Sequence, residues 1–236
     1  MKRLLVVLAA ASLLGASLLA PPAASAKKPH VFAPSAQPFG ANHAEWQARW
    51  FKWFIEIPAP TNPLFDETGA LCAINQSGPV WFTAPVARTG TTTRACTIPV
   101  GTSLFILGLG NECSNIEPPP FFGATEAELR ACAAEGFEQF WGDATVSITV
   151  DGIPVPNVYR YRTQTPLFSY TLPEDNLYGL PAGSTATKAI SDGNAVIVKP
   201  LPPGNHRIVT HIDAPILGAP TDVILNITVL PRGHGD

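Results

Sequence analysis

The stretch that decides the fold spans residues 62–111 and reads NPLFDETGALCAINQSGPVWFTAPVARTGTTTRACTIPVGTSLFILGLGN. Cys72 and Cys96 enclose a short apolar run at residues 80–82, and a second apolar run at residues 104–109 follows a Pro-Val-Gly turn. Short apolar runs bounded by turn residues are typical of β-strands. The stretch therefore predicts consecutive strands tied by a disulfide. It contains no recognisable catalytic or binding motif, so it predicts a fold and not a function.

The N-terminal segment has the composition of a secretory signal peptide. The residues Met-Lys-Arg precede an apolar run over residues 4–20, and the small residues Ala-Ser-Ala precede two lysines. This order predicts cleavage after Ala26. A membrane anchor is the alternative, but Pro21 and Pro22 end the apolar run short of the roughly 20 residues that a span requires. We therefore expect a secreted or periplasmic protein, without membrane insertion after the signal is cleaved.

The composition favours a turn-rich β protein and disfavours two classes of partner. The chain of 236 residues has 25 prolines and 19 glycines but only 14% charged residues, as expected where many turns join short strands. Its formal net charge is −3, and loss of Lys2 and Arg3 with the signal makes it more negative. Because no basic cluster is present, neither nucleic acid nor an anionic membrane surface is an expected partner.

Four cysteines, Cys72, Cys96, Cys113 and Cys132, follow the signal. An even number of cysteines in an exported protein usually forms disulfides. Of the three possible pairings, we favour Cys72–Cys96 with Cys113–Cys132, because each closes a local loop and the first pair could join neighbouring strands. A four-thiolate zinc site is the alternative, but the closely spaced cysteine pairs typical of such sites are missing. No metal and no cofactor are predicted.

Two helices are predicted, each opened by a capping box. The first begins with Asn-x-x-Glu at residues 42–45 and runs to about residue 56, and the second begins with Thr-x-x-Glu at residues 125–128. Trp46, Trp50 and Trp53 fall on one stripe of the first helix. Exposed tryptophans can bind sugars, but the helical spacing favours packing of this stripe against a sheet.

Period-two alternation, apolar runs and turn residues predict eight or nine short strands. Besides the two runs above, they are expected at residues 144–150, 158–163, 166–172, 195–199, 207–212 and 222–230. Asp192-Gly193 reads as a turn between two of them. The fold class is therefore mainly β: an antiparallel β-sandwich, of which the jelly roll is one form, with two short helices packed on it. An α+β open sheet is the alternative.

We expect a single domain with short extensions. The predicted plan is a signal peptide at residues 1–26, an extended N-terminal lead at 27–41, one β-sandwich domain at 42–230 and a flexible tail at 231–236. No internal repeat and no second linker interrupts the domain.

Several motifs together resemble a family of exported bacterial proteins. They are, in chain order, EWQARWFKWFIEIP, ALCAINQSGPVWFTAP, RACTIPVGTSLFILGLGNEC, SDG and PLPPGNHRI. The resemblance covers nearly the whole chain after the signal and implies export and a single domain. That family has no assigned activity, so the resemblance implies no catalytic or binding residue.

The candidate ligand pocket consists of Asp66, Gln76, Asn111 and Glu112. These residues lie in the loops that flank the central strands, and they form a polar pocket if the loops meet at one end of the sandwich. A glycosidase needs two carboxyl groups about 5 or 6.5–9.5 Å apart across a cleft, and Asp66 with Glu112 is the pair that the sequence offers. Turn capping or a surface position is the simpler role for each.

The histidines give little indication of a metal site. His206 and His211 are five residues apart in a predicted strand, so they point to opposite faces and cannot bind one ion. His211 and Asp213 share a face, but a surface histidine is the simpler reading.

Three hypotheses of function follow from the sequence. The leading one is a non-enzymatic exported module, either cell-surface-associated or binding a saccharide or a protein. The second is a small extracellular hydrolase, similar to a glycosidase, that uses Asp66 and Glu112. The third is an assembling protein whose aromatic helix forms an interface. A buried carboxylate pair with a raised pKa, lining a cleft, would contradict the first hypothesis.

Overall fold

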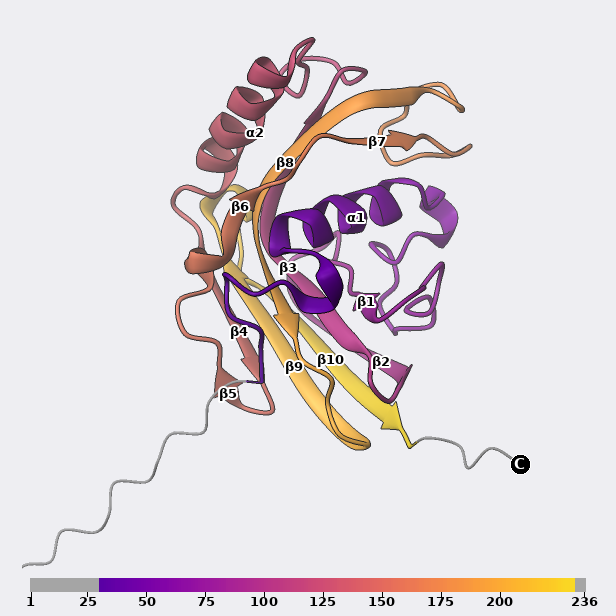
Figure 1. Ribbon diagram of the computed structural model, residues 1–236, viewed down its shortest axis with the longest axis vertical. Coiled ribbons are helices and arrows are strands. Elements are labelled where there is room, and N and C mark those ends of the chain that lie inside the picture. Colours follow the sequence, from indigo (N-terminus) through magenta and orange to yellow (C-terminus); the bar gives the residue numbers. More distant parts are fainter. Residues whose placement is uncertain (1–29, 232–236) are drawn as a thin grey trace, which may run out of the picture.

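The computed structural model describes residues 30–231, so the predicted signal peptide and residues 232–236 of the predicted tail lie outside the described residues. Two five-stranded sheets pack against each other, and two helices accompany them (Figure 1). This arrangement confirms the predicted mainly β sandwich with two packed helices, and it excludes the alternative of an α+β open sheet. Within residues 30–231, no helix has both the length and the apolar composition of a membrane span.

The first sheet has the strand order β1-β3-β8-β6, with β7 also paired to β8. Its strands are β1 (Val80–Phe82), β3 (Ser103–Ser114), β6 (Arg162–Gln164), β7 (Phe168–Thr171) and β8 (Thr185–Val198). The β1–β3 pair is parallel and the other pairs are antiparallel. The long strands β3 and β8 are buried over most of their length on both faces, so this sheet is the middle layer of the protein.

The second sheet has the strand order β2-β10-β9-β4-β5. Its strands are β2 (Gly90–Pro99), β4 (Thr145–Val150), β5 (Ile153–Pro154), β9 (Gly204–Asp213) and β10 (Thr221–Leu230). Here β2 and β10 are parallel, and the remaining pairs are antiparallel. Short 3-10 helices complete the order at η1 (Pro38–Gly40), η2 (Ala59–Thr61), η3 (Val158–Tyr161) and η4 (Pro215–Leu217).

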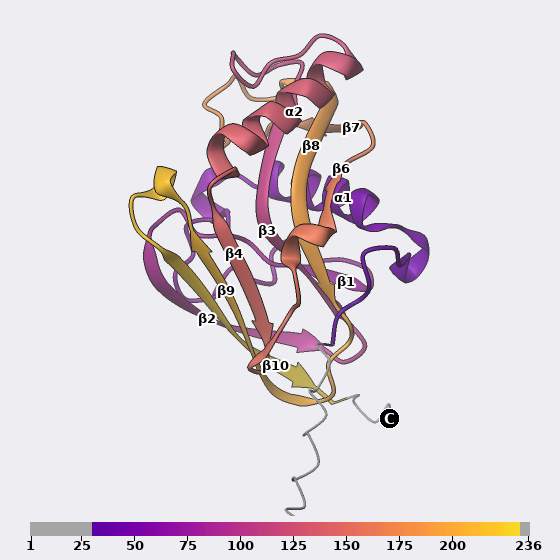
Figure 2. The ribbon, with the colours of Figure 1, turned by 90° about the vertical axis from the view of Figure 1, so that its left-hand side faces the viewer.

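The middle sheet separates two apolar cores. Leu104 and Ile106 of β3 face the second sheet, whereas Phe105 between them faces helix α1 (His43–Ile55), because neighbouring side chains in a strand point to opposite faces. Helix α2 (Glu126–Trp141) covers the other end of the same face that the second sheet covers (Figure 2). The layers are thus α1, then the first sheet, then the second sheet together with α2.

Both helices begin as the sequence predicts. The side chains of Asn42 and Thr125 accept hydrogen bonds from the backbone N–H groups of Glu45 and Glu128. The carboxylate of each glutamate in turn accepts a hydrogen bond from the backbone N–H of its cap residue. Trp46, Trp50 and Trp53 are only 5%, 1% and 9% exposed. Packing of the tryptophan stripe into the core is therefore confirmed, and α1 does not present these rings as a sugar-binding platform.

Three local predictions were wrong. The strand expected at residues 158–163 is mostly the 3-10 helix η3, and β6 begins only at Arg162. Asp192-Gly193 does not form a turn but lies within β8. The glycine is needed there because a Cβ on Gly193 would lie 2.6 Å from the carbonyl oxygen of Leu109 on the paired strand. The stretch GTTTRACTIP, for which no strand was predicted, forms the whole of β2.

Both predicted disulfides, Cys72–Cys96 and Cys113–Cys132, are present. The first does not tie consecutive strands, since Cys72 lies in a loop and Cys96 lies on β2 of the second sheet. The second joins β3 to α2. Two disulfides indicate an oxidising environment.

Candidate functional site

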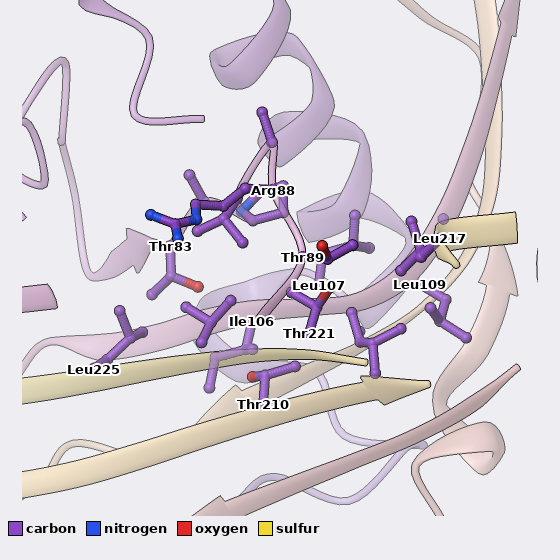
Figure 3. A pocket seen from close by; sticks show the side chains of 18 of the residues that line it. Thr83, Arg88, Thr89, Ile106, Leu107, Leu109, Thr210, Leu217, Thr221 and Leu225 are labelled. Atoms are coloured by element: carbon purple, nitrogen blue, oxygen red, sulfur yellow. The ribbon is translucent and has the colours of Figure 1, made fainter. Parts of the chain in front are cut away.

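A hollow lined mainly by apolar side chains lies between the two sheets, at the end where helix α2 meets the strands. Its volume is about 480 Å³, which is within the range of sites for small organic molecules. Figure 3 shows its lining side chains. Nearly all of them are aliphatic or small: Thr83, Ala84, Pro85, Val86, Ala87, Arg88, Thr89, Ile106, Leu107, Gly108, Leu109, Gly110, Trp141, Thr210, Ile212, Leu217, Thr221, Val223 and Leu225. We call this hollow the inter-sheet cavity.

One wall of the cavity is the irregular middle of β3. The register between β3 and β8 shifts between Leu107 and Leu109. The side chain of Asn194 on β8 holds this bulge, since its Oδ1 accepts a hydrogen bond of 2.7 Å from the backbone N–H of Leu109. A Cβ on Gly108 would lie 2.5 Å from the same oxygen, so the bulge requires glycine. Leu109 turns toward the second sheet, while Leu107 packs on the α1 side.

The opposite wall comes from β9 and β10 of the second sheet. Thr210 pairs with Val223, and Thr221 pairs with Ile212, so the four residues form adjoining rows on the inward face. The two threonines are 6% and 5% exposed. Within residues 30–231, no hydrogen bond is formed by either hydroxyl, and both side chains line the cavity.

The third side is the loop of residues 83–89 between β1 and β2, which we call the lip (Figure 3). Hydrogen bonds to other parts of the protein fix it at both Thr83 and Ala87. Thr83 donates its N–H and hydroxyl to Phe105 O, at 3.1 and 2.9 Å, and the indole of Trp50 donates to Thr83 O at 2.8 Å. Ala87 donates to Leu64 O at 3.2 Å. The lip is thus attached to β3, to α1 and to the preceding loop.

A buried arginine fixes the middle of the lip. Arg94 of β2 is 3% exposed, and its guanidinium donates to four backbone carbonyls: Asp66 at 2.6 Å, Ala84 at 2.7 Å, Pro63 at 2.7 Å and Pro85 at 3.1 Å. Burial lowers the pKa of Arg94, and the negative charge of Asp66 opposes that shift. Two loops that are separate in the sequence are therefore joined through one side chain. Nothing in the local sequence around Arg94 predicts this role.

Asp66 and Gln76, two of the four predicted pocket residues, stabilise the loop before β1. The carboxylate of Asp66 accepts hydrogen bonds from the backbone of Thr68, Gly69 and Leu71 at 2.8–2.9 Å. Burial opposes ionisation, but these bonds outweigh it and lower the pKa of Asp66. The amide of Gln76 donates to Phe82 O and accepts from Phe82 N, at 2.8 and 2.9 Å. Each side chain is thus occupied by its own loop.

Asn111 and Glu112, the other two, are neighbours on β3 and point to opposite faces. Asn111 faces α2, since a Cβ on Gly136 would lie 2.3 Å from its amide nitrogen. Glu112 faces the α1 side and accepts a hydrogen bond of 2.9 Å from the hydroxyl of Tyr178. None of the four predicted residues lines the inter-sheet cavity.

Glu112 belongs to a buried acidic pair that its position in the sequence does not predict. Glu117, whose Oε2 accepts a 2.9 Å hydrogen bond from Ser114, is its partner. Burial first, and then the charge of Glu117, raise the pKa of Glu112 well above its usual range, and burial raises the pKa of Glu117. Among the described residues, Glu112 Oε1 and the hydroxyl of Tyr170 have no hydrogen-bond partner. The two carboxyl groups are only 7% and 8% exposed and do not line the inter-sheet cavity, so the pair does not form a catalytic cleft there.

Comparisons with known proteins add little to this picture. No family model matches the sequence. No curated protein sequence matches it. A solved structure described as "Structure of PbICP-C in complex with falcipain-2" has 14% identity and covers 64% of this chain and 99% of that chain. Its TM-score is 0.25, which is too low to indicate a shared fold.

Proposed function

We propose that this protein is a non-enzymatic, exported binding module that holds an apolar small molecule between its two sheets. The observation that carries the proposal is the inter-sheet cavity of about 480 Å³. Burial of an apolar ligand surface in such a space is favourable by roughly 25 cal/mol per Å². The two disulfides support export, because bonds of this kind persist in oxidising compartments.

The lining of the cavity favours binding over catalysis. Of its side chains, only Arg88 is titratable, and an arginine stays protonated at ordinary pH. General acid–base chemistry needs a group whose proton is exchanged near the working pH. The hydrolase hypothesis has no support from Asp66 and Glu112, since the loop backbone occupies the first and a tyrosine hydroxyl contacts the second.

The same lining favours an apolar ligand over a saccharide. A sugar exposes hydroxyl groups on every side, and each buried hydroxyl that lacks a partner costs free energy. The cavity offers few free polar groups, chiefly the hydroxyls of Thr89, Thr210 and Thr221. A ligand that is mainly hydrocarbon fits this arrangement better.

The test is titration with N-phenyl-1-naphthylamine, a neutral apolar dye whose fluorescence rises in a nonpolar site. The full exported chain should bind one dye with saturation. Thr89→Trp places an indole at the lip and should weaken binding at least tenfold. Thr91→Trp, an exposed threonine on the outward face of β2, is the matched control and should bind as the wild type does. Absence of binding, or equal binding by both variants, would refute the proposal.

A further inference from the structure

The inter-sheet cavity has one polar end, and this end indicates the class of ligand. Arg88 is the one charged residue among those that line it, and Thr89 follows directly in the lip. Gly90, the next residue, is the register partner of Thr221, and its N–H donates to Pro220 O at 2.9 Å. Arg88 and Thr89 are therefore neighbours in the lip, and Thr221 lies on the strand beside the residue that follows them.

The threonine hydroxyls at this end are available to a ligand. Thr221 is 5% exposed, and within residues 30–231 its hydroxyl forms no hydrogen bond. Thr83, in contrast, already donates its hydroxyl to Phe105 O at 2.9 Å. A hydroxyl without a protein partner is satisfied by water, which a polar ligand atom can replace. A polar ligand atom beside Thr221 would do so.

Arg88 is held by a partner that a ligand can replace. Its Nη1 lies 2.7 Å from Glu67 Oε2, and the two side chains are 50% and 61% exposed. Exposed ion pairs of this kind contribute little to stability. The planar guanidinium has enough donors to bind a second carboxylate, and a carboxylate partly shielded from water by the lip would bind it more strongly than an exposed one does.

From these contacts we propose that the ligand is a single-chain carboxylate, whose hydrocarbon fills the cavity and whose carboxylate binds Arg88 and the hydroxyls of Thr89 and Thr221. This inference rests on the proposed binding function. It adds the charge of the ligand and places its head group at the lip, with the hydrocarbon between β3 and the second sheet. The single positive charge of Arg88 matches the single negative charge of a carboxylate, and the two neutral hydroxyls add hydrogen bonds without adding charge.

The test compares decanoate, decanol and decyl phosphate as competitors of the neutral dye. Decanoate should displace the dye at lower concentration than the other two. Arg88→Gln should weaken decanoate about fivefold, in line with about 1 kcal/mol for a charged contact, while decanol is unchanged. Glu67→Gln removes the competing carboxylate and should tighten decanoate about twofold. Arg207→Gln, an exposed arginine on β9 away from the cavity, is the matched control and should have no effect.

The outcomes separate this inference from the proposed function. If dye, decanol and decanoate all fail to bind, the binding function itself is refuted. If decanol binds as well as decanoate, or if Arg88→Gln and Arg207→Gln affect decanoate equally, the cavity binds hydrocarbon but the carboxylate assignment is overturned. Tighter binding of decyl phosphate than of decanoate also overturns it, in favour of a doubly charged head group.

Discussion

Replacement of Arg94 by methionine should destabilise the protein and loosen the lip of the cavity. Methionine retains much of the side-chain length but has no donor, so four backbone carbonyls lose hydrogen bonds of 2.6–3.1 Å. Removal of one partner from a buried polar contact leaves the other unsatisfied, which costs about 1–3 kcal/mol per group. Part of that cost is offset because a buried charge is no longer desolvated.

The net loss in the free energy of unfolding should be about 3–5 kcal/mol, since several buried carbonyls lose their donor and the removal of the charge offsets only part of that cost. For a domain of this size, each kcal/mol lowers the melting temperature by about 2–4 °C, so a decrease of about 10 °C is expected. Arg88→Met is the control from the same lip. Its ion pair with Glu67 is exposed, and its loss should change the free energy of unfolding by less than about 1 kcal/mol.

Urea denaturation measures the stability of both variants, with an unchanged slope as the check that the same surface is exposed on unfolding. Hydrogen exchange then tests the lip itself. The amide of Ala87, which donates to Leu64 O at 3.2 Å, should exchange faster in Arg94→Met than in the wild type at equal global stability. A loss below about 1 kcal/mol, or unchanged exchange at Ala87, would refute the role assigned to Arg94.

Three further predictions concern buried or closely packed groups. The pKa of Glu112 is raised by burial and by Glu117, so its stabilising effect is complete below its unfolded pKa and is lost as the pH rises through the folded value. Glu112→Gln should therefore lose less stability than the wild type between pH 5 and pH 9 in urea titrations, and an unchanged pH profile would contradict this. The pKa of Asp66 is lowered, so the pH dependence has the opposite sign, and the wild type should lose stability as the pH falls through the folded pKa. Asp66→Asn should lack this loss and should be about 1–2 kcal/mol less stable than the wild type at pH 7. Gly193→Ala would place a Cβ 2.6 Å from Leu109 O and should lower the free energy of unfolding by about 1–3 kcal/mol. An unchanged free energy of unfolding would show that β3 and β8 are not closely packed at Gly193.

The elements that depend on local chemistry were predictable from the sequence. The capping boxes at Asn42 and Thr125 identified both helix starts, because the hydrogen bonds involved lie within four residues. The alternating pattern from Thr145 to Val150 gave β4. The disulfide pairing was also correct, since both loops are short and local.

Features that depend on distant contacts were not predictable. Asp192-Gly193 has the composition of a turn, but the close approach of β3 selects glycine inside a strand. The first half of β2 consists of Gly90, three threonines and Arg94. The strand character of β2 comes from ten register pairs with β10, more than 120 residues away. The cavity forms only where β3, the lip and the second sheet meet. Polarity alone predicts a pocket role for Asp66, Gln76, Asn111 and Glu112, but in the structure their side chains stabilise loops or lie in buried contacts.

Trp141 gives the inter-sheet cavity an optical signal of its own. Its ring lines the cavity while its Nε1 donates to Gly110 O at 3.0 Å. Hydrocarbon that enters beside the ring replaces water, and indole emission moves to shorter wavelength in less polar surroundings. A ligand without colour can thus be followed by tryptophan fluorescence, and Trp141→Phe should remove the spectral shift while the dye still binds.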